Sequence, residues 1–173
     1  MTNLYAIGIG SNRCHGRHGR PAQIVAAALE LLCPVSVSPI FGTTPIGPSS
    51  RRFANAAALI ESPLAPPAML AELKRIERDF GRRRGRRWGE RVLDLDILLW
   101  SGGRWSSRDL IIPHTELIRR RFALMPLARI APEWRIQGQG TVRQHATRLT
   151  RPRPTHRSGR GRVRSSVGRA SDF

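Results

Sequence analysis

The chain has 173 residues, with 30 basic side chains against 12 acidic ones and a formal net charge of +18. This length suits one domain with a sizeable core and is too short for two ordinary domains. Its two cysteines, Cys14 and Cys33, are too few for a disulfide framework, and no Cys/His spacing indicates a zinc site. We therefore expect a soluble, cytoplasmic protein without a secretory leader or a membrane span.

The positive charge is uneven along the chain. Residues 143–173 contain nine arginines and a single acidic side chain, so nearly half of the net charge lies in a short terminal stretch. Lys74 is the only lysine, and this use of arginine fits a GC-rich coding background as well as a binding role. Charge alone therefore does not indicate a nucleic-acid-binding protein.

Hydrophobic periodicity predicts a mixture of strands and helices. Period-two stretches predict strands, and apolar residues three or four apart predict helices. Pro39 restricts its strand to an edge or an irregular position, and Gly102-Gly103 between two tryptophans predicts a hairpin turn. The elements that we expect are strands over residues 3–9, 35–43, 53–60 and 93–99 and helices over residues 21–32, 66–80 and 123–130.

The end of the chain differs from the rest in composition. Periodicity is lost from about Thr141, and Arg, Pro, Ser, Gly and Thr dominate the residues that follow. Such a composition cannot bury a core. We therefore expect one folded domain over residues 1–141 and a disordered, arginine-rich tail over residues 142–173.

Chemistry is concentrated around a pair of aspartates. Asp94 and Asp96 alternate with apolar residues, so they are expected on one face of a half-buried strand. Two adjacent carboxylates repel each other unless a cation lies beside them, and hard cations such as Mg²⁺ prefer oxygen ligands. Six arginines suited to phosphate precede or flank the pair, namely Arg82, Arg83, Arg84, Arg86, Arg87 and Arg91.

This combination predicts a nucleotide-polyphosphate site. Two other interpretations stay open for the separate parts. An Asp-x-Asp on a strand is often a solvated sheet face, and an arginine run is often a basic surface or an RNA contact.

Several further motifs occur in a fixed order along the chain, and together they resemble the 6-hydroxymethyl-7,8-dihydropterin pyrophosphokinases of folate synthesis. The resemblance covers about residues 4 to 135. The matching stretches are Gly10-Ser11-Asn12, Thr43 to Pro48, Phe53 to Ala56, Leu73 to Glu77, Gly81 to Arg84, Arg87 to Asp96, Ile112-Pro113-His114 and Arg120 to Pro132.

The resemblance implies a ferredoxin-like α+β fold, with a mainly antiparallel four-stranded sheet and helices packed on it. It also implies transfer of pyrophosphate from ATP to 6-hydroxymethyl-7,8-dihydropterin, which gives the pterin diphosphate and AMP. Asp94 and Asp96 would hold two Mg²⁺ ions, and Arg82 and Arg91 would complete the catalytic set by clamping phosphate oxygens.

The remaining site residues also follow from the resemblance. The ATP-binding set is Glu77, Arg84, Arg87, Trp88, Ile97, His114, Thr115 and Arg120. The pterin-binding set is Thr43, Thr44, Ile46, Phe53, Asn55, Trp88 and Phe122. ATP and the pterin are then the expected partners of a monomer whose folded domain binds no nucleic acid.

The chain departs from the common form of the family at four places. These are Glu90 before the arginine of the Trp-Gly-x-Arg motif, Thr44 in the pterin loop, Phe53 where tyrosine is common, and Thr115 after the histidine. None removes a metal ligand or a clamp arginine, so we expect activity. The alternatives are an RNA-binding module on the same fold and a nucleotide-binding protein without catalysis.

Overall fold

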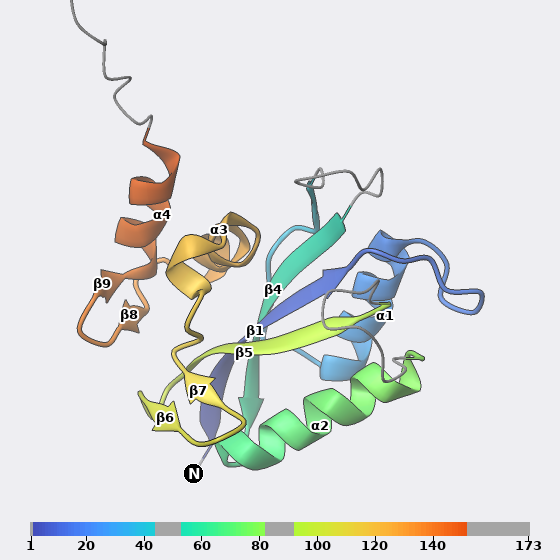
Figure 1. The fold of residues 1–173 in the computed structure, drawn as a ribbon, viewed down its shortest axis with the longest axis horizontal. Coiled ribbons are helices and arrows are strands. Elements are labelled where there is room, and N and C mark those ends of the chain that lie inside the picture. The colour runs from blue at the N-terminus through green and yellow to red at the C-terminus, as the bar shows by residue number, and fades with distance from the viewer. Residues whose placement is uncertain (1, 44–52, 82–91, 152–173) are drawn as a thin grey trace, which may run out of the picture.

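The computed structural model describes residues 2–43, 53–81 and 92–151. An antiparallel sheet lies at its centre, with strand order β2-β4-β1-β5 and with β3 also paired to β4 (Figure 1). Because β2 and β3 share one side of β4, the sheet keeps the expected four-strand width. The strands are β1 (Asn3–Ser11), β2 (Ser36–Val37), β3 (Phe41–Thr43), β4 (Phe53–Ser62) and β5 (Asp94–Trp100). The expected antiparallel α+β architecture is confirmed.

The predicted irregularity at Pro39 is also found. It separates β2 from β3, and Ser38 bridges the break by bonding Ala57 of β4 twice. The Ser38 backbone N–H donates to the Ala57 carbonyl at 2.9 Å, and the Ser38 Oγ accepts from the Ala57 N–H at 2.9 Å. The Ser38 hydroxyl oxygen thus serves as the acceptor for the Ala57 N–H next to the break between β2 and β3.

Helices cover the sheet from two sides. α1 (Pro21–Leu32) and α2 (Pro66–Asp79) lie on one side in Figure 1, whereas α3 (Arg121–Ile130) and α4 (Val142–Thr150) lie on the other. The first core packs under α1 and α2 and includes Ile7, Ala56 and Leu95, and the second core packs under α3 and includes Ala6, Ala57 and Leu124. Alternate residues of the same strands therefore enter different cores, as a period of two requires.

The alternation breaks once, within β5. Ile7 pairs with Ile97, but Ala6 pairs with Leu99, so Leu98 is an extra residue opposite β1. Such a β-bulge changes which side the following residues face. Leu98 and Leu99 both enter the second core, so the period-two alternation predicted for residues 93–99 does not extend to Leu99, which faces the side opposite to Leu95.

The chain after β5 forms small elements rather than a hairpin on that strand. The Gly103 N–H donates to the Trp100 carbonyl at 3.0 Å, and Gly103 has a φ of 97°, so the glycine turn is present as predicted. It leads to β6 (Trp105–Ser106), which pairs with β7 (Ile111–Ile112) instead of returning along β5. A 3-10 helix, η1 (Leu117–Arg119), then precedes α3.

The folded part extends beyond the expected boundary at residue 141. β8 (Arg135–Ile136) and β9 (Gly140–Thr141) form a hairpin that leads into α4. Thr141 caps α4 by accepting from the Gln144 N–H, and Val142, His145 and Ala146 are buried. The placement of residues 142–150 in a disordered tail is therefore wrong, and residues 152–173 lie outside the described part of the chain. Within the described ranges no helix is both long and apolar enough to cross a membrane.

Candidate functional site

Two rows of residues that cross the sheet form the floor of the candidate site, where β1 ends and where β4 and β5 begin. In the first row Asn55 of β4 pairs with Gly10 of β1, which pairs with Asp94 of β5. In the second row Gly8 pairs with Asp96. By strand alternation all five residues face the same side of the sheet as the second core. The fold thus brings a residue predicted to bind pterin and the two predicted metal ligands onto one surface.

Glycine occupies the centre of both rows. A Cβ on Gly10 would lie 3.3 Å from the Asn55 Oδ1, so the amide of Asn55 leans over the space that a side chain would fill. A Cβ on Gly8 would lie 3.2 Å from the Leu98 Cδ2. Gly8 was not singled out from the sequence, although glycine at alternate positions of a strand signals a close approach over that face.

Asp94 and Asp96 are half-buried on β5, which matches the expected strand. Their carboxylates are hard oxygen donors on one strand face, which is a donor set that suits Mg²⁺. Across the described ranges no group of three His, Cys, Asp or Glu side chains is arranged to hold a metal. Two carboxylates would therefore have to be supplemented by phosphate oxygens and water, as is common for Mg²⁺ bound with a nucleotide.

Glu77 does not lie on this surface. Its side chain is fully buried, and its Oε1 accepts from the Leu95 N–H at 2.8 Å and from the Lys74 Nζ at 2.7 Å. The Lys74 Nζ also donates to the Leu95 carbonyl at 3.3 Å. Both side chains thus connect α2 to β5 between the two aspartates, which is a role that sequence reasoning did not assign.

His114 is hydrogen-bonded to β5 at Leu98, the bulge residue. Its backbone N–H donates to the Leu98 carbonyl at 3.0 Å, and its Nδ1 accepts from the Glu116 N–H at 3.2 Å. When the imidazole is neutral, its proton is therefore on Nε2, where it can be donated to a ligand. Thr115 follows and is exposed.

Arg120 and Phe122 stand together at the start of α3. Arg120 is the N-cap residue, and its guanidinium carbon lies 5.8 Å from the centroid of the Phe122 ring, within the range of a cation–π contact. Phe122 is 45% exposed, although Ala123 and Leu124, which follow it in the helix, are buried. An exposed ring of this size is available to stack on a planar ligand.

Two other predicted residues occupy different surroundings. Ile97 is only 2% exposed and its side chain lies in the first core, so any contact with a nucleotide would have to come from its backbone. Phe53 opens β4 and pairs with Thr43 of β3, two residues from Asn55 along the strand. The predicted residues that lie outside the described ranges are Thr44, Ile46, Arg82, Arg84, Arg87, Trp88 and Arg91.

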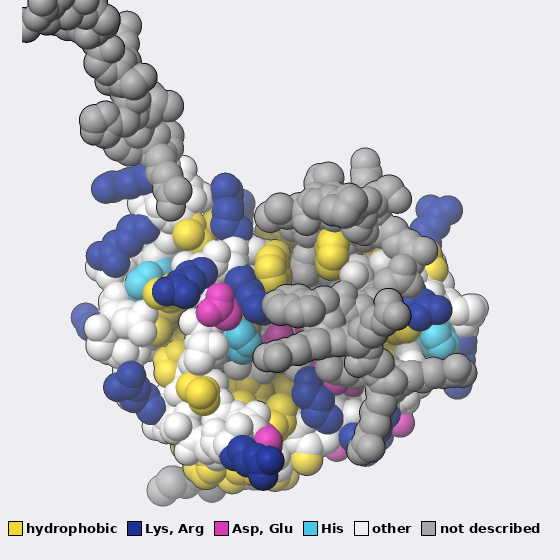
Figure 2. All heavy atoms as spheres, viewed as in Figure 1, with side chains coloured by type: hydrophobic (Ala, Val, Ile, Leu, Met, Phe, Trp, Pro, Cys, Tyr) yellow, Lys and Arg dark blue, Asp and Glu magenta, His cyan; other side chains and the backbone are white. Residues whose placement is uncertain are grey.

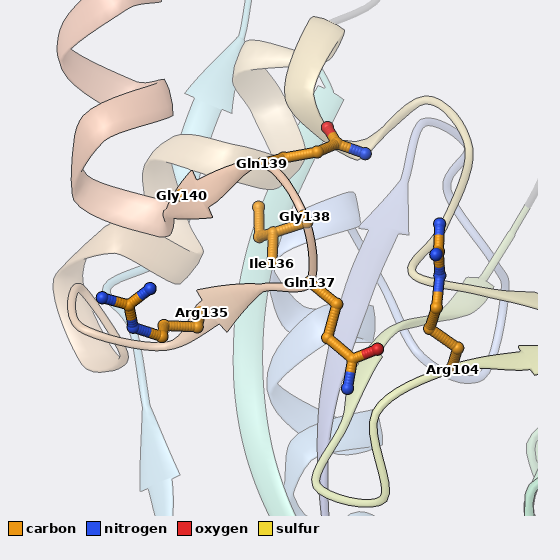
Figure 3. A pocket seen from close by; sticks show the side chains of 7 residues that line it. All are labelled: Arg104, Arg135, Ile136, Gln137, Gly138, Gln139 and Gly140. Atoms are coloured by element: carbon orange, nitrogen blue, oxygen red, sulfur yellow. The ribbon is translucent and has the colours of Figure 1, made fainter.

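A cavity of about 490 Å³ lies elsewhere, around the β8–β9 hairpin (Figure 3). Arg104 and Arg135 line it, but in the figure their side chains extend in different directions and their guanidinium groups do not meet at a common centre. Figure 2 likewise shows dark blue arginine and lysine side chains scattered over the visible face, with apolar and uncharged surface between them. The residues that line the cavity include no aromatic side chain, so the cavity lacks the interleaved basic and aromatic groups of an RNA-binding sheet.

Comparison with known proteins identifies the family. The family model described as 7,8-dihydro-6-hydroxymethylpterin-pyrophosphokinase (HPPK) matches residues 6–132. A 2-amino-4-hydroxy-6-hydroxymethyldihydropteridine pyrophosphokinase of Methylorubrum extorquens is 38% identical over 156 residues, which cover 86% of this chain and 94% of the relative. The protein of the same name from Pseudomonas aeruginosa is 40% identical over 142 residues, covering 79% and 85%.

A solved structure supports the fold. The HPPK-DHPS protein of Plasmodium falciparum, crystallised with pterin and p-hydrobenzoate, superimposes with a TM-score of 0.66 at 14% identity. The superposition covers 86% of this chain and 44% of that longer protein. At this identity the likeness concerns the fold alone, while the family model and the bacterial relatives carry the assignment. The chain therefore belongs to the 7,8-dihydro-6-hydroxymethylpterin-pyrophosphokinase family.

Proposed function

We propose that this protein transfers pyrophosphate from ATP to 6-hydroxymethyl-7,8-dihydropterin and releases AMP, a step of folate biosynthesis. The observation that carries the proposal is the cross-sheet row of Asn55, Gly10 and Asp94 in a chain that belongs to this family. One end of the row offers an amide that can both donate and accept hydrogen bonds, and the other end offers carboxylates.

The spacing of the row supports the proposal. Asn55 and Asp94 are separated by two interstrand steps, so their Cα atoms are about 10 Å apart. A pterin ring held at Asn55 could thus present its hydroxymethyl group toward phosphates held near Asp94 and Asp96. Such positioning is the main contribution that a protein makes to phosphoryl transfer.

Asp94 and Asp96 would hold two Mg²⁺ ions together with the phosphates. When bound, Mg²⁺ neutralises the charge that develops on the phosphoryl oxygens and fixes the phosphates for in-line attack. In the same proposal Arg82 and Arg91 clamp the phosphates, with Arg84, Arg87 and Trp88 beside them. His114, Thr115, Arg120 and the backbone of Ile97 contribute to ATP binding, as the family resemblance implies.

The pterin is planar and carries polar groups along its edge. Asn55 is only 6% exposed and has apolar neighbours on β4. A buried amide is stabilised by several hydrogen-bond partners. Phe122 would stack on one face of the ring, and Phe53 with Thr43, Thr44, Ile46 and Trp88 would complete the pterin site. Stacking suits a rigid bicyclic ligand because little side-chain entropy is lost.

The test is AMP formation from ATP and Mg²⁺, with and without the pterin, in the parent chain and in Asp96→Ala. We expect pterin-dependent AMP in the parent and a rate about 1,000-fold lower in the variant, because half of the metal-binding carboxylate set is removed. Asp109→Ala is the matched control, since Asp109 is an exposed aspartate in the loop between β6 and β7. A well-folded parent that forms no pterin-dependent AMP would overturn the proposal.

The competing functions make different predictions in the same assay. A nucleotide-binding protein without catalysis would retain ATP but release no AMP. An RNA-binding module would require RNA affinity on the sheet, where the Asp94 and Asp96 carboxylates repel phosphate in the absence of a cation. The monomeric state and the cytoplasmic location stay predictions from the sequence.

A further inference from the structure

β5 is an edge strand, because β1 pairs with only one of its sides and no other strand of the described chain follows it in the sheet order. The outward N–H and C=O groups of an edge strand lack ladder partners. Leu95 bonds to α2 with both groups, so both point away from β1. The edge is therefore covered at Leu95 by side chains rather than by backbone.

The contacts at Leu95 form a closed ring. The Leu95 N–H donates to the Glu77 Oε1 at 2.8 Å, the Lys74 Nζ donates to the same oxygen at 2.7 Å, and it also donates to the Leu95 carbonyl at 3.3 Å. Glu77 is fully buried, whereas one third of the Lys74 side chain is exposed. Charge-assisted hydrogen bonds to a buried carboxylate are among the stronger contacts in proteins.

The ring acts on two peptide planes. The N–H of Leu95 belongs to the peptide that joins it to Asp94, and the carbonyl of Leu95 belongs to the peptide that joins it to Asp96. Each bonded plane is thus attached directly to the Cα of one aspartate. Leu95 itself is completely buried in the first core, so the strand is held on its edge and on its apolar face at the same residue.

We propose that Lys74 and Glu77 are positioning residues that brace Leu95 and thereby set the separation and direction of the Asp94 and Asp96 carboxylates. The brace acts from the helix side of the sheet on a site that faces the opposite side. Outer groups of this kind often change metal affinity by about 10- to 100-fold when they are removed, although they touch no metal.

The composition of the chain supports a specific need at position 74. Lys74 is the only lysine among 30 basic residues, and every other basic side chain is arginine. An ammonium group is a compact donor of three hydrogen bonds on a flexible stem, whereas a guanidinium is broad and planar. The two oxygens that Lys74 contacts belong to a side chain of its own helix and to a strand, and a compact donor can reach both.

The test compares Lys74→Met, which has no donor, with Lys74→Gln, whose amide keeps two N–H donors without the charge. Arg75→Met is the matched control, because it removes one positive charge from the adjacent, exposed position of the same helix. Two measurements are made on each variant. The first is the hydrogen-exchange rate of the Leu95 amide, and the second is the affinity for Mg²⁺ in the presence of a non-hydrolysable ATP analogue, by calorimetry.

In Lys74→Met we expect Leu95 exchange to be about 10-fold faster and Mg²⁺ binding about 10-fold weaker than in the parent, with Lys74→Gln in between and Arg75→Met unchanged. In the pterin assay the loss should appear in kcat and in the Mg²⁺ requirement rather than in the KM for pterin. Lys74→Met that matches Arg75→Met in both measurements would overturn the proposal. The proposal would also be overturned if Lys74→Gln lost as much Leu95 protection and Mg²⁺ affinity as Lys74→Met, since the charge of Lys74 and not its hydrogen bonds would then be responsible.

One measurement needs no variant. In the parent the Leu95 amide should be protected although it lies on the outward edge of β5, and exchange at the rate of an unprotected amide would overturn the brace even if Lys74→Met failed to fold. The effect of the brace on catalysis rests on the proposed function, whereas the brace itself does not. A parent that binds no pterin and forms no AMP, but protects Leu95 and loses Mg²⁺ affinity in Lys74→Met, would refute the proposed function and retain the brace.

Discussion

The two faces of the central sheet are built from the same strands but differ in what they bury. On the face under α1 and α2, β1, β4 and β5 bury mainly apolar side chains in the first core, including Ile7, Ala56 and Leu95. The buried polar residues Ser11 and Ser62 lie at the last positions of β1 and β4. On the opposite face only the half under α3 is apolar, and the other half carries Asn55, Gly10 and Asp94 in one row. One face can therefore supply stability while half of the other is given to polar groups.

The difference shows how the chain tolerates two carboxylates close to its centre. Each aspartate is preceded and followed by a residue buried on the opposite face, so the strand is anchored without help from the polar side. Lys74 and Glu77 extend this anchoring to the edge of β5. The structure thus separates the residues that hold the strand from the residues that it displays.

The largest expected effect is a contrast between neighbouring residues of β5. Leu95→Ala should lower the free energy of unfolding by about 2–5 kcal/mol, because it leaves a cavity in the first core at a residue with 0% exposure. Asp96→Ala should change it by about 1 kcal/mol or less while removing activity. Urea denaturation of both variants tests the contrast, and equal destabilisation would show that the polar half of the sheet is also needed for folding.

The next effect concerns α4, which packs on α3 at the far side of the sheet. A chain ending at Thr141 should be less stable than a chain ending at Arg151 by about 2–3 kcal/mol, since it exposes the second core where Val142 and Ala146 are buried. Thermal unfolding of the two truncated chains measures the difference. Equal melting temperatures would show that the stable domain ends at residue 141, as the composition indicates.

The boundary at α4 illustrates what sequence reasoning missed. The composition of this short, arginine-containing stretch indicates disorder. It also contains a helical pattern, because the apolar residues Val142, Ala146 and Leu149 are four and three residues apart. A Thr-x-x-Gln capping box from Thr141 to Gln144 was a second available signal. Both were local, and only the second core shows what the helix packs against.

Other elements could be predicted because their patterns are long or their breaks are chemically specific. α1 and α2 follow from apolar spacing, the interrupted edge strand from Pro39, and the acidic strand from its alternation. The bulge at Leu98 could not be predicted, because adjacent leucines fit either face equally well. The brace at Leu95 required knowing that α2 lies beside the edge of β5, which is a tertiary fact that the spacing of Lys74 and Glu77 does not reveal.

A smaller effect is expected at the glycine floor of the site. Gly10→Ala would place a Cβ 3.3 Å from the Asn55 Oδ1, so the amide must shift by a few tenths of an ångström. We expect the KM for pterin to rise by about 10-fold, roughly 1.4 kcal/mol, with kcat little changed. Gly42→Ala on β3 is the control, because among the described residues no atom apart from its chain neighbours lies within 4 Å of the added Cβ. A fall in kcat alone would indicate that Gly10 acts on the aspartate side of the row instead.

The smallest expected effect is a pH dependence at the end of α2. The His18 ring stacks on Phe80 at 4.3 Å and on His15 at 5.1 Å between ring centroids. Burial lowers the pKa of the His18 imidazole, and the nearby His15 and Arg17 lower it further. The unfolded chain therefore takes up a proton at a higher pH than the folded chain does, so this contribution to stability is complete above the ordinary histidine pKa of about 6.5 and is lost as the pH falls below it.

His18→Phe keeps an aromatic ring against Phe80 but cannot titrate. Between pH 7.5 and 5.5 the melting temperature of the parent should fall by about 1–3 °C more than that of the variant, because only the parent has at position 18 an imidazole that takes up a proton more readily when the chain is unfolded. His15 and Arg17 are present in both proteins, so they contribute equally to both sides of the comparison to first order. A variant that loses as much stability as the parent would mean that His18 is protonated equally in the folded and unfolded chains, and that its stack on Phe80 places no constraint on its charge.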